Sequence, residues 1–213
     1  ATTANSLSSG DSIDGGAGVD TLTSTLNGAS IAVTLKDVEV LNITGITADS
    51  TVDMINVTGL TDLNSISSTM NMTFNNIVNI PNIGINSDGT AKTQTFNFRD
   101  SAMSGGSDDV LLTLNNSAGA IALTAEAGAT NKIETVSIDA VTSASTVDDL
   151  QTTAVGATAL EITGSADLTI TAALDNEVVS IAAGTSTGDV TLTLGTGAVT
   201  AAMGSGADNV TAG

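Results

Sequence analysis

The chain has 213 residues, and its 23 acidic and 4 basic side chains give it a formal net charge of −19. Such a surface repels nucleic acid and anionic lipid headgroups, which excludes both as partners, and it attracts divalent cations. Cysteine and histidine are absent from the sequence, which excludes disulfides, zinc–thiolate sites and catalysis that needs a thiol or an imidazole base.

The first motif in the chain is a glycine-rich nonapeptide. Residues 15–23 read GGAGVDTLT and match the calcium-binding pattern GGxGxDxUx, in which U is a large apolar residue. Glycines permit tight turns with positive φ and leave carbonyl oxygens free to face a cation, and the aspartate adds a charged, hard oxygen. The pattern predicts a calcium-binding turn made by Gly15, Gly16, Gly18 and Asp20.

A partial copy of this motif precedes it in register. Residues 9–14 read SGDSID, and a shift of nine residues puts Asp11 in the aspartate position and Ile13 in the apolar position. Asp11 and Asp14 are therefore further candidate calcium ligands.

Most of the remaining chain alternates between apolar and polar residues. The alternating runs are rich in Thr, Val and Ile, lie between Gly, Asn, Asp and Ser turns, and predict short strands. They cover residues 31–35, 38–40, 70–74, 96–98, 121–123, 160–162, 168–170 and 190–194. Hydrophobic residues make up 41% of the chain, too many for a disordered segment, yet no apolar run approaches the roughly 18 residues of a membrane span.

Two segments are candidates for short helices. The sequence Ser-Thr-Val-Asp begins at Ser50 and again at Ser145, and in both places it has the form of a capping box. The many β-branched residues that follow keep any such helix short.

The same two segments belong to an internal duplication. Residues 38–58 and 133–153 are identical at eight of 21 positions with a constant offset of 95 residues, and most differences exchange one apolar residue for another. Repetition of this kind is expected where successive coils stack and each buries the face of its neighbour. The sequence predicts one all-β domain over residues 1–213, an elongated parallel β-solenoid or β-roll. A sandwich-like arrangement is the alternative for its central portion, residues 71–85, which contain Pro81.

Two weaker copies of the glycine–aspartate motif follow. The central copy supplies Gly106, Asp108 and Asp109, and the copy near the end of the chain supplies Gly204, Gly206 and Asp208. The alternative at both places is an ordinary Gly/Asp turn between strands, which uses the same residue types.

These motifs, the Thr/Ala/Gly/Asn-rich strands and the absence of His and Cys together resemble the RTX-type surface-layer (S-layer) proteins of Gram-negative bacteria. The resemblance implies a calcium-dependent structural protein that leaves the cell by type I secretion and assembles with copies of itself on the cell surface. It also implies that the chain is a segment of a longer protein, which contacts outer-membrane polysaccharide through another region.

The same resemblance limits the calcium sites. In the RTX fold about two nonapeptides make one turn, and an ion lies between loops one turn apart. The loop of Asp20 therefore needs a partner about 18 residues further on, where the acidic residues Asp37 and Glu39 do not belong to a glycine-rich loop. We expect some calcium sites to be incomplete within this segment.

Two other functions remain as alternatives. One is a spacer or ligand-binding segment of a large RTX adhesin, and the other is a fragment of an enzyme whose catalytic domain lies elsewhere. Residues 184–188 match the G-x-S-x-G pattern of a nucleophilic serine, but that mechanism needs a histidine and the chain has none. We therefore predict that this chain is not an enzyme.

Overall fold

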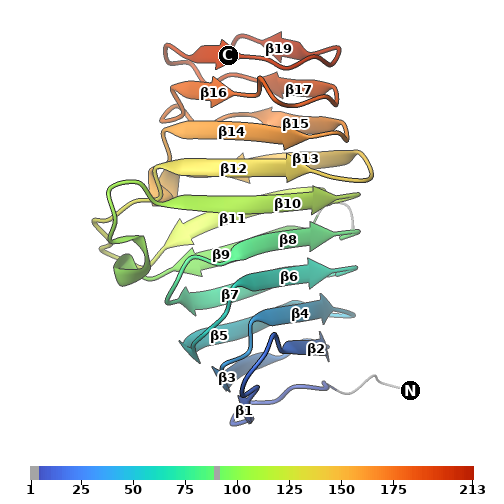
Figure 1. Cartoon of the computed structure of the whole chain (residues 1–213), viewed down its shortest axis with the longest axis vertical. Coiled ribbons are helices and arrows are strands. Elements are labelled where there is room, and N and C mark those ends of the chain that lie inside the picture. The colour runs from blue at the N-terminus through green and yellow to red at the C-terminus, as the bar shows by residue number, and fades with distance from the viewer. Residues whose placement is uncertain (1–4, 89–91) are drawn as a thin grey trace.

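The strands of the computed structural model, which describes residues 5–88 and 92–213, pair in parallel and form two sheets. The chain alternates between the sheets, so one strand of each sheet makes one coil, and about nine such coils stack into a solenoid (Figure 1). The predicted all-β parallel solenoid is confirmed.

The ten-stranded sheet contains the odd-numbered strands in chain order. They are β1 (Ser12–Asp14), β3 (Ser30–Lys36), β5 (Ser50–Val57), β7 (Met72–Ile77), β9 (Thr93–Phe98), β11 (Ala118–Ala125), β13 (Ser145–Gln151), β15 (Leu168–Ala173), β17 (Val190–Thr193) and β19 (Asn209–Thr211). The nine-stranded sheet contains the even-numbered strands. They are β2 (Thr21–Leu26), β4 (Val40–Gly45), β6 (Asp62–Ile66), β8 (Asn82–Asn86), β10 (Asp109–Asn115), β12 (Thr135–Ala140), β14 (Ala159–Gly164), β16 (Ser180–Ala182) and β18 (Thr200–Ala202).

Each coil therefore turns twice, at two opposite edges of the solenoid. We call these the even-to-odd edge, on the right in Figure 1, and the odd-to-even edge, on the left. Two single-turn 3-10 helices, η1 (Asp100–Met103) and η2 (Thr153–Val155), lie in turns of the odd-to-even edge. Within the described part of the chain, no helix has the length and apolar character needed to cross a bilayer.

The helices expected after Ser50 and Ser145 do not form, because both residues begin strands, β5 and β13. Their hydroxyl groups accept hydrogen bonds from the backbone N–H of Ala29 and Ser117 in the preceding coil, at 3.2 Å each. Each serine thus accepts a hydrogen bond from the preceding coil instead of capping a helix. The β-branched residues after it favour a strand.

The alternative of a central sandwich is also wrong. Residues 71–85 continue the solenoid through β7 and β8, which pair in parallel with the strands on either side. Pro81 is buried in the turn directly before β8, a position that does not require a backbone N–H from the ladder.

Stacks of like side chains fill the space between the two sheets. In the even-numbered sheet an aliphatic stack runs through Leu41, Leu63, Ile83, Leu112, Ile138 and Ile162, each in register with the next. In the odd-numbered sheet the rings of Phe74 and Phe96 are parallel within 9°, with centroids 5.3 Å apart. Burying each such side chain stabilises the fold by about 1.5–3 kcal/mol. Because each side chain packs against those of the adjacent coils, the coils stabilise one another.

One polar cluster interrupts this apolar interior. Asp88, which follows β8, is only 4% exposed, and Ser65, Ser68 and Gln94 are buried beside it. Its Oδ1 accepts the backbone N–H of Ser68 at 2.8 Å, whereas its Oδ2 has no hydrogen-bond partner among the residues that the structure describes. Burial raises the pKa of Asp88 above its ordinary value of 3.8, and bonds from Ser65 and Ser68 oppose that shift.

This cluster makes the stability depend on pH in a direction that can be tested. Because the pKa of Asp88 is higher in the folded than in the unfolded chain, its contribution is fully present below the unfolded pKa and is lost as pH rises through the folded pKa. We expect Asp88→Asn, which keeps the Oδ1 acceptor, to raise the free energy of unfolding at pH 7 by about 1–2 kcal/mol. Urea denaturation followed by circular dichroism from pH 4 to 8 measures this. A variant that is less stable at pH 7 would contradict the prediction.

Candidate functional site

The predicted calcium-binding turn connects β1 and β2 at the odd-to-even edge. Gly16 and Gly18 have φ values of 89° and 129°, a conformation that favours glycine. Gly15 is required for a different reason, because a Cβ there would clash with the carbonyl oxygen of Asp37 in the next coil. The three predicted glycines therefore shape this turn and let the next coil approach it closely.

Asp20 closes the same turn. Its side chain lies against Gly15, where a Cβ would be only 2.8 Å from the Cβ of Asp20. Its backbone N–H donates to a carboxylate oxygen of Glu39 at 2.8 Å. Its Oδ2 is buried and accepts no hydrogen bond from residues 5–88 or 92–213. The predicted ligand Asp20 thus has one carboxylate oxygen that can still accept a hydrogen bond or bind a cation.

Lys36 lies between two other carboxylates of this region. Its Nζ is 2.8 Å from Oδ2 of Asp14 and 2.9 Å from Oδ2 of Asp37. The hydrogen bond from Lys36 lowers the pKa of Asp14, and both carboxylates raise the pKa of Lys36. An ammonium group therefore neutralises Asp14 in this structure, and a calcium ion at Asp14 would have to compete with it.

The structure does not bring Asp11 to Asp20. Asp11 precedes β1 at the even-to-odd edge, and its Oδ2 accepts the N–H of Ser8 at 2.8 Å. Asp20 precedes β2 at the opposite edge. A shift of nine residues is half a coil, so it moves a residue to the other edge of the solenoid.

The central motif forms a turn between η1 and β10. Oδ2 of Asp108 accepts the N–H of Gly105 at 2.7 Å, and a carboxylate oxygen of Glu134 accepts the N–H of Asp108 at 2.8 Å. Gly106 leaves open space where a Cβ would stand. Asp109 begins β10 and instead accepts the hydroxyl of Ser137 at 2.9 Å and 3.1 Å. The two adjacent carboxylates therefore serve different partners.

The last motif lies at the even-to-odd edge, directly before β19. A Cβ at Gly204 or Gly206 would clash with the carbonyl oxygens of Ser186 and Gly188 in the coil before it. Oδ1 of Asp208 accepts the N–H of Val190 at 2.9 Å. The turn 184–188, which carries the G-x-S-x-G string, is thus the layer on which the motif stacks.

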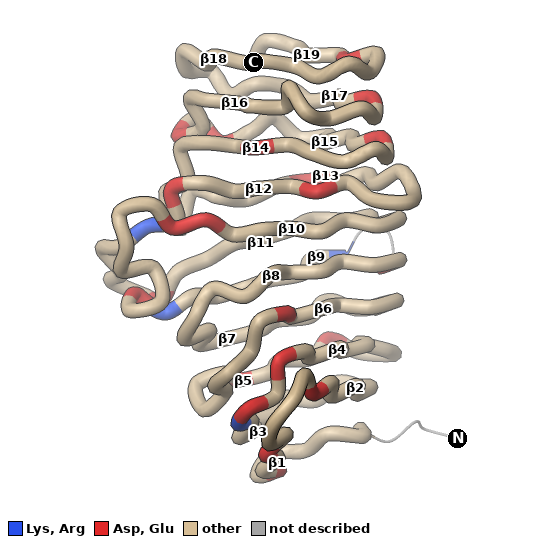
Figure 2. The backbone as a smooth tube through the Cα atoms, viewed as in Figure 1, with Lys and Arg blue, Asp and Glu red and all other residues tan. Residues whose placement is uncertain are grey.

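Two aspartates of this edge were not predicted from the sequence. Asp167 and Asp189 directly precede β15 and β17, and Oδ1 of Asp167 accepts the N–H of Asp189 at 2.9 Å. Oδ1 of Asp189 in turn accepts the N–H of Ala207 at 2.6 Å. Asp208 continues this series through its bond to Val190, and Figure 2 shows acidic positions beside β15, β17 and β19. The sequence does contain a signal for these positions, since each aspartate comes at or next to the start of an apolar alternating run.

The internal duplication marks the residues that hold neighbouring coils together. Glu39 and Glu134 are identical positions of the repeat, and each accepts a backbone N–H from the preceding coil. Thr47 and Thr142 are another identical pair, and both have positive φ, 67° and 62°, in the turn that follows an even-numbered strand. β-Branched residues rarely adopt this conformation, so packing against the neighbouring coils must enforce it.

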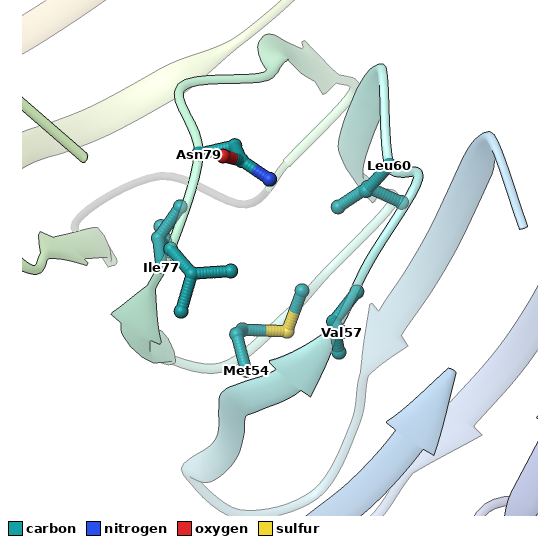
Figure 3. Close-up of a pocket in the computed structure, with 6 residues that line it drawn as sticks. Met54, Val57, Leu60, Ile77 and Asn79 are labelled. Atoms are coloured by element: carbon teal, nitrogen blue, oxygen red, sulfur yellow. The ribbon is translucent and has the colours of Figure 1, made fainter. Parts of the chain in front are cut away.

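A small apolar cavity near β5 and β7 is not a ligand site. The side chains of Met54, Val57, Leu60 and Ile77 converge on it, with Asn79 at its rim (Figure 3). Its volume is about 10 Å³, which is room for about one water molecule.

The described residues contain no group of three or more acidic side chains that is arranged to hold a metal ion. The donor chemistry of turn 15–20 nevertheless suits calcium, because the buried Oδ2 of Asp20 and the backbone carbonyls of a glycine turn are hard oxygen ligands. Comparison of the chain with known protein families, with curated proteins and with solved structures found no match. Its function is therefore argued from geometry.

The carboxylates that bond across coils should contribute measurably to stability. We expect Glu134→Ala to lower the free energy of unfolding by about 1–2 kcal/mol, because the N–H of Asp108 loses its partner. The matched control is Glu161→Ala, since Glu161 is exposed in the middle of β14, and it should change stability by less than about 0.5 kcal/mol. Equal effects of the two substitutions in urea denaturation would refute the structural role of Glu134.

Proposed function

We propose that this chain is a structural, calcium-dependent component of a bacterial surface layer that assembles with copies of itself outside the cell. One observation supports this proposal above the others. A regular solenoid carries, at one edge, a glycine turn with a buried carboxylate oxygen of Asp20 that no described residue satisfies.

The proposed role of calcium is electrostatic. At a net charge of −19 the chain repels itself, and stacked carboxylates such as Asp167, Asp189 and Asp208 add to this repulsion. Asp20 and the carbonyl groups of turn 15–20 would hold the ion, and Asp37 and Glu39 lie in the coil beside them. When bound, the ion neutralises carboxylate charge and couples metal binding to folding.

This coupling fits a protein that is exported before it folds. Extracellular calcium modules bind with dissociation constants of about 10⁻⁴–10⁻³ M. Such a chain would remain loosely folded where calcium is scarce and would fold outside, where it is plentiful. Self-assembly is supported by the outer faces of the sheets, where small exposed residues, such as Ser180 and Ala182 of β16, allow close approach.

Calcium should stabilise the fold and cause copies of the chain to assemble. At 10 mM calcium and a dissociation constant near 10⁻⁴ M, linkage predicts about 2.7 kcal/mol of stabilisation. For a chain of this size that corresponds to a rise in melting temperature of about 5–10 °C, measured by circular dichroism. Negative-stain electron microscopy should show ordered sheets that disperse in a chelator. Calcium-induced stiffening of a protein that stays monomeric would instead indicate an adhesin spacer.

Asp20 should carry much of this effect. We expect Asp20→Asn to reduce the calcium-induced rise in melting temperature to less than half, because the amide offers the ion a neutral oxygen. The control Asp148→Asn removes the same charge from an exposed position of β13 and should leave the rise unchanged. Equal losses in both variants would show that calcium acts by general screening.

A further inference from the structure

A hollow of about 340 Å³ opens on the outer face of the even-numbered sheet, over β6, β8 and β10. These strands lie toward the viewer in Figure 1. Their register places the outward residues in a grid of three columns. The columns are Asp62, Asn82 and Leu111; Asn64, Gly84 and Thr113; and Ile66, Asn86 and Asn115.

Gly84 stands at the centre of this grid and lines the hollow. The amide of Asn64 lies where a side chain of Gly84 would stand, and most of the residues that line the hollow are polar. The backbone of Gly84 is ordinary strand, which any residue adopts. Glycine weakens a strand interior and is common where a ligand approaches closely. Its presence here makes room for the amide of Asn64, which a larger residue would displace into the hollow.

Asn64 and Asn82 use their amide nitrogens as donors, whereas Oδ1 of Asn86 already accepts from Ser87 and Asn115. Nδ2 of Asn64 donates to Asn42 at 2.8 Å, and Nδ2 of Asn82 donates to Asp62 at 3.3 Å. The amide donors are thereby used along the stack of coils. Oδ1 of Asn64 projects over Gly84, where an added Cβ would meet it.

Asn115 carries an unsatisfied acceptor at the edge of the hollow. Its Nδ2 donates to Asn86 at 3.3 Å, while its Oδ1 is buried without a hydrogen-bond partner in the described chain. An unpaired buried acceptor is unfavourable, but this oxygen is covered and its amide is held by Asn86, so we do not count it among the ligand contacts.

The chemistry of the rim selects the ligand. Carbonyl and carboxylate oxygens accept hydrogen bonds, so the ligand must be rich in donors. The net charge of −19 disfavours an anion. The apolar side chain of Ile66 lies on the same rim and suits a C–H surface. The volume is at the small end of the range for small-molecule sites, about 300–1,000 Å³. Many hydroxyl groups on a compact C–H framework describe a sugar.

We infer that the hollow beside Gly84 binds an uncharged saccharide, through the amide oxygens of Asn64 and Asn82. This site lies on a sheet face, away from the glycine turns, and does not depend on the proposed role of calcium. It gives the chain a neutral glycan as a partner in addition to copies of itself.

The test is nuclear magnetic resonance titration of the ¹⁵N-labelled chain with neutral gluco-, galacto- and mannotrioses, and with an acidic trigalacturonate. At least one neutral trisaccharide should shift the side-chain amide signals of Asn64, Asn82, Asn86 and Asn115, and trigalacturonate should not. Gly84→Val fills the hollow with a good strand former and should weaken binding at least about tenfold. Its spectrum also reports whether the variant is folded.

Two further variants make the result specific. Asn64→Ala enlarges the hollow but removes an acceptor, so it should weaken binding if hydrogen bonds matter and not if space alone does. Ala182→Val, an outward small residue on β16, is the matched control and should bind as the parent chain does. The inference fails if no neutral trisaccharide shifts these signals, if Gly84→Val binds equally well, or if calcium alone produces the same shifts.

Discussion

Every coil of this solenoid must return the chain in register with the coil before it. The stacks of Leu41, Leu63 and Ile83, and of Phe74 and Phe96, exist only because successive turns close over the same distance between the edges. The turns themselves differ widely in length, from the short connection between β2 and β3 to the lobe that contains η1. The constraint applies to where each turn begins and ends, and the residues at those points carry the cross-coil hydrogen bonds.

Acidic side chains help to keep successive coils in register by bonding across them. Glu39, Glu134, Asp167 and Asp189 each accept a backbone N–H of an adjacent coil, which satisfies donors that turns would otherwise leave open. Negative charge thus accumulates along the edges as a consequence of how coils are joined. An acidic chain of this kind gains from cations, which links the architecture to the proposed dependence on calcium.

Glycine serves two separate purposes in the same framework. Gly15, Gly204 and Gly206 let backbones of adjacent coils approach at the edges, where a Cβ would meet a carbonyl oxygen. Gly84 lies in the middle of a strand, where it makes room for the amide side chain of Asn64 on the outer face of the sheet. The first group supports the stack, and the second position gives one face a local shape that the rest of the grid lacks.

The amino-acid sequence was sufficient to predict the all-β solenoid and several of its strands, because alternation of apolar and polar residues is a local signal. The acidic composition and the repeat are properties of the sequence itself. It also located the turn at Gly15 and Asp20. Which residues meet across coils became clear only from the fold. Asp20 contacts Glu39 across 19 residues, Asp167 contacts Asp189 across 22, and Asp108 contacts Glu134 across 26. The local sequence at Ser50 and Ser145 resembles a helix cap, but the hydrogen-bond partners of these serines lie one coil away and are not visible in that sequence. Periodicity shows which face a side chain occupies, but the length of each turn sets the neighbour, and that length varies from coil to coil.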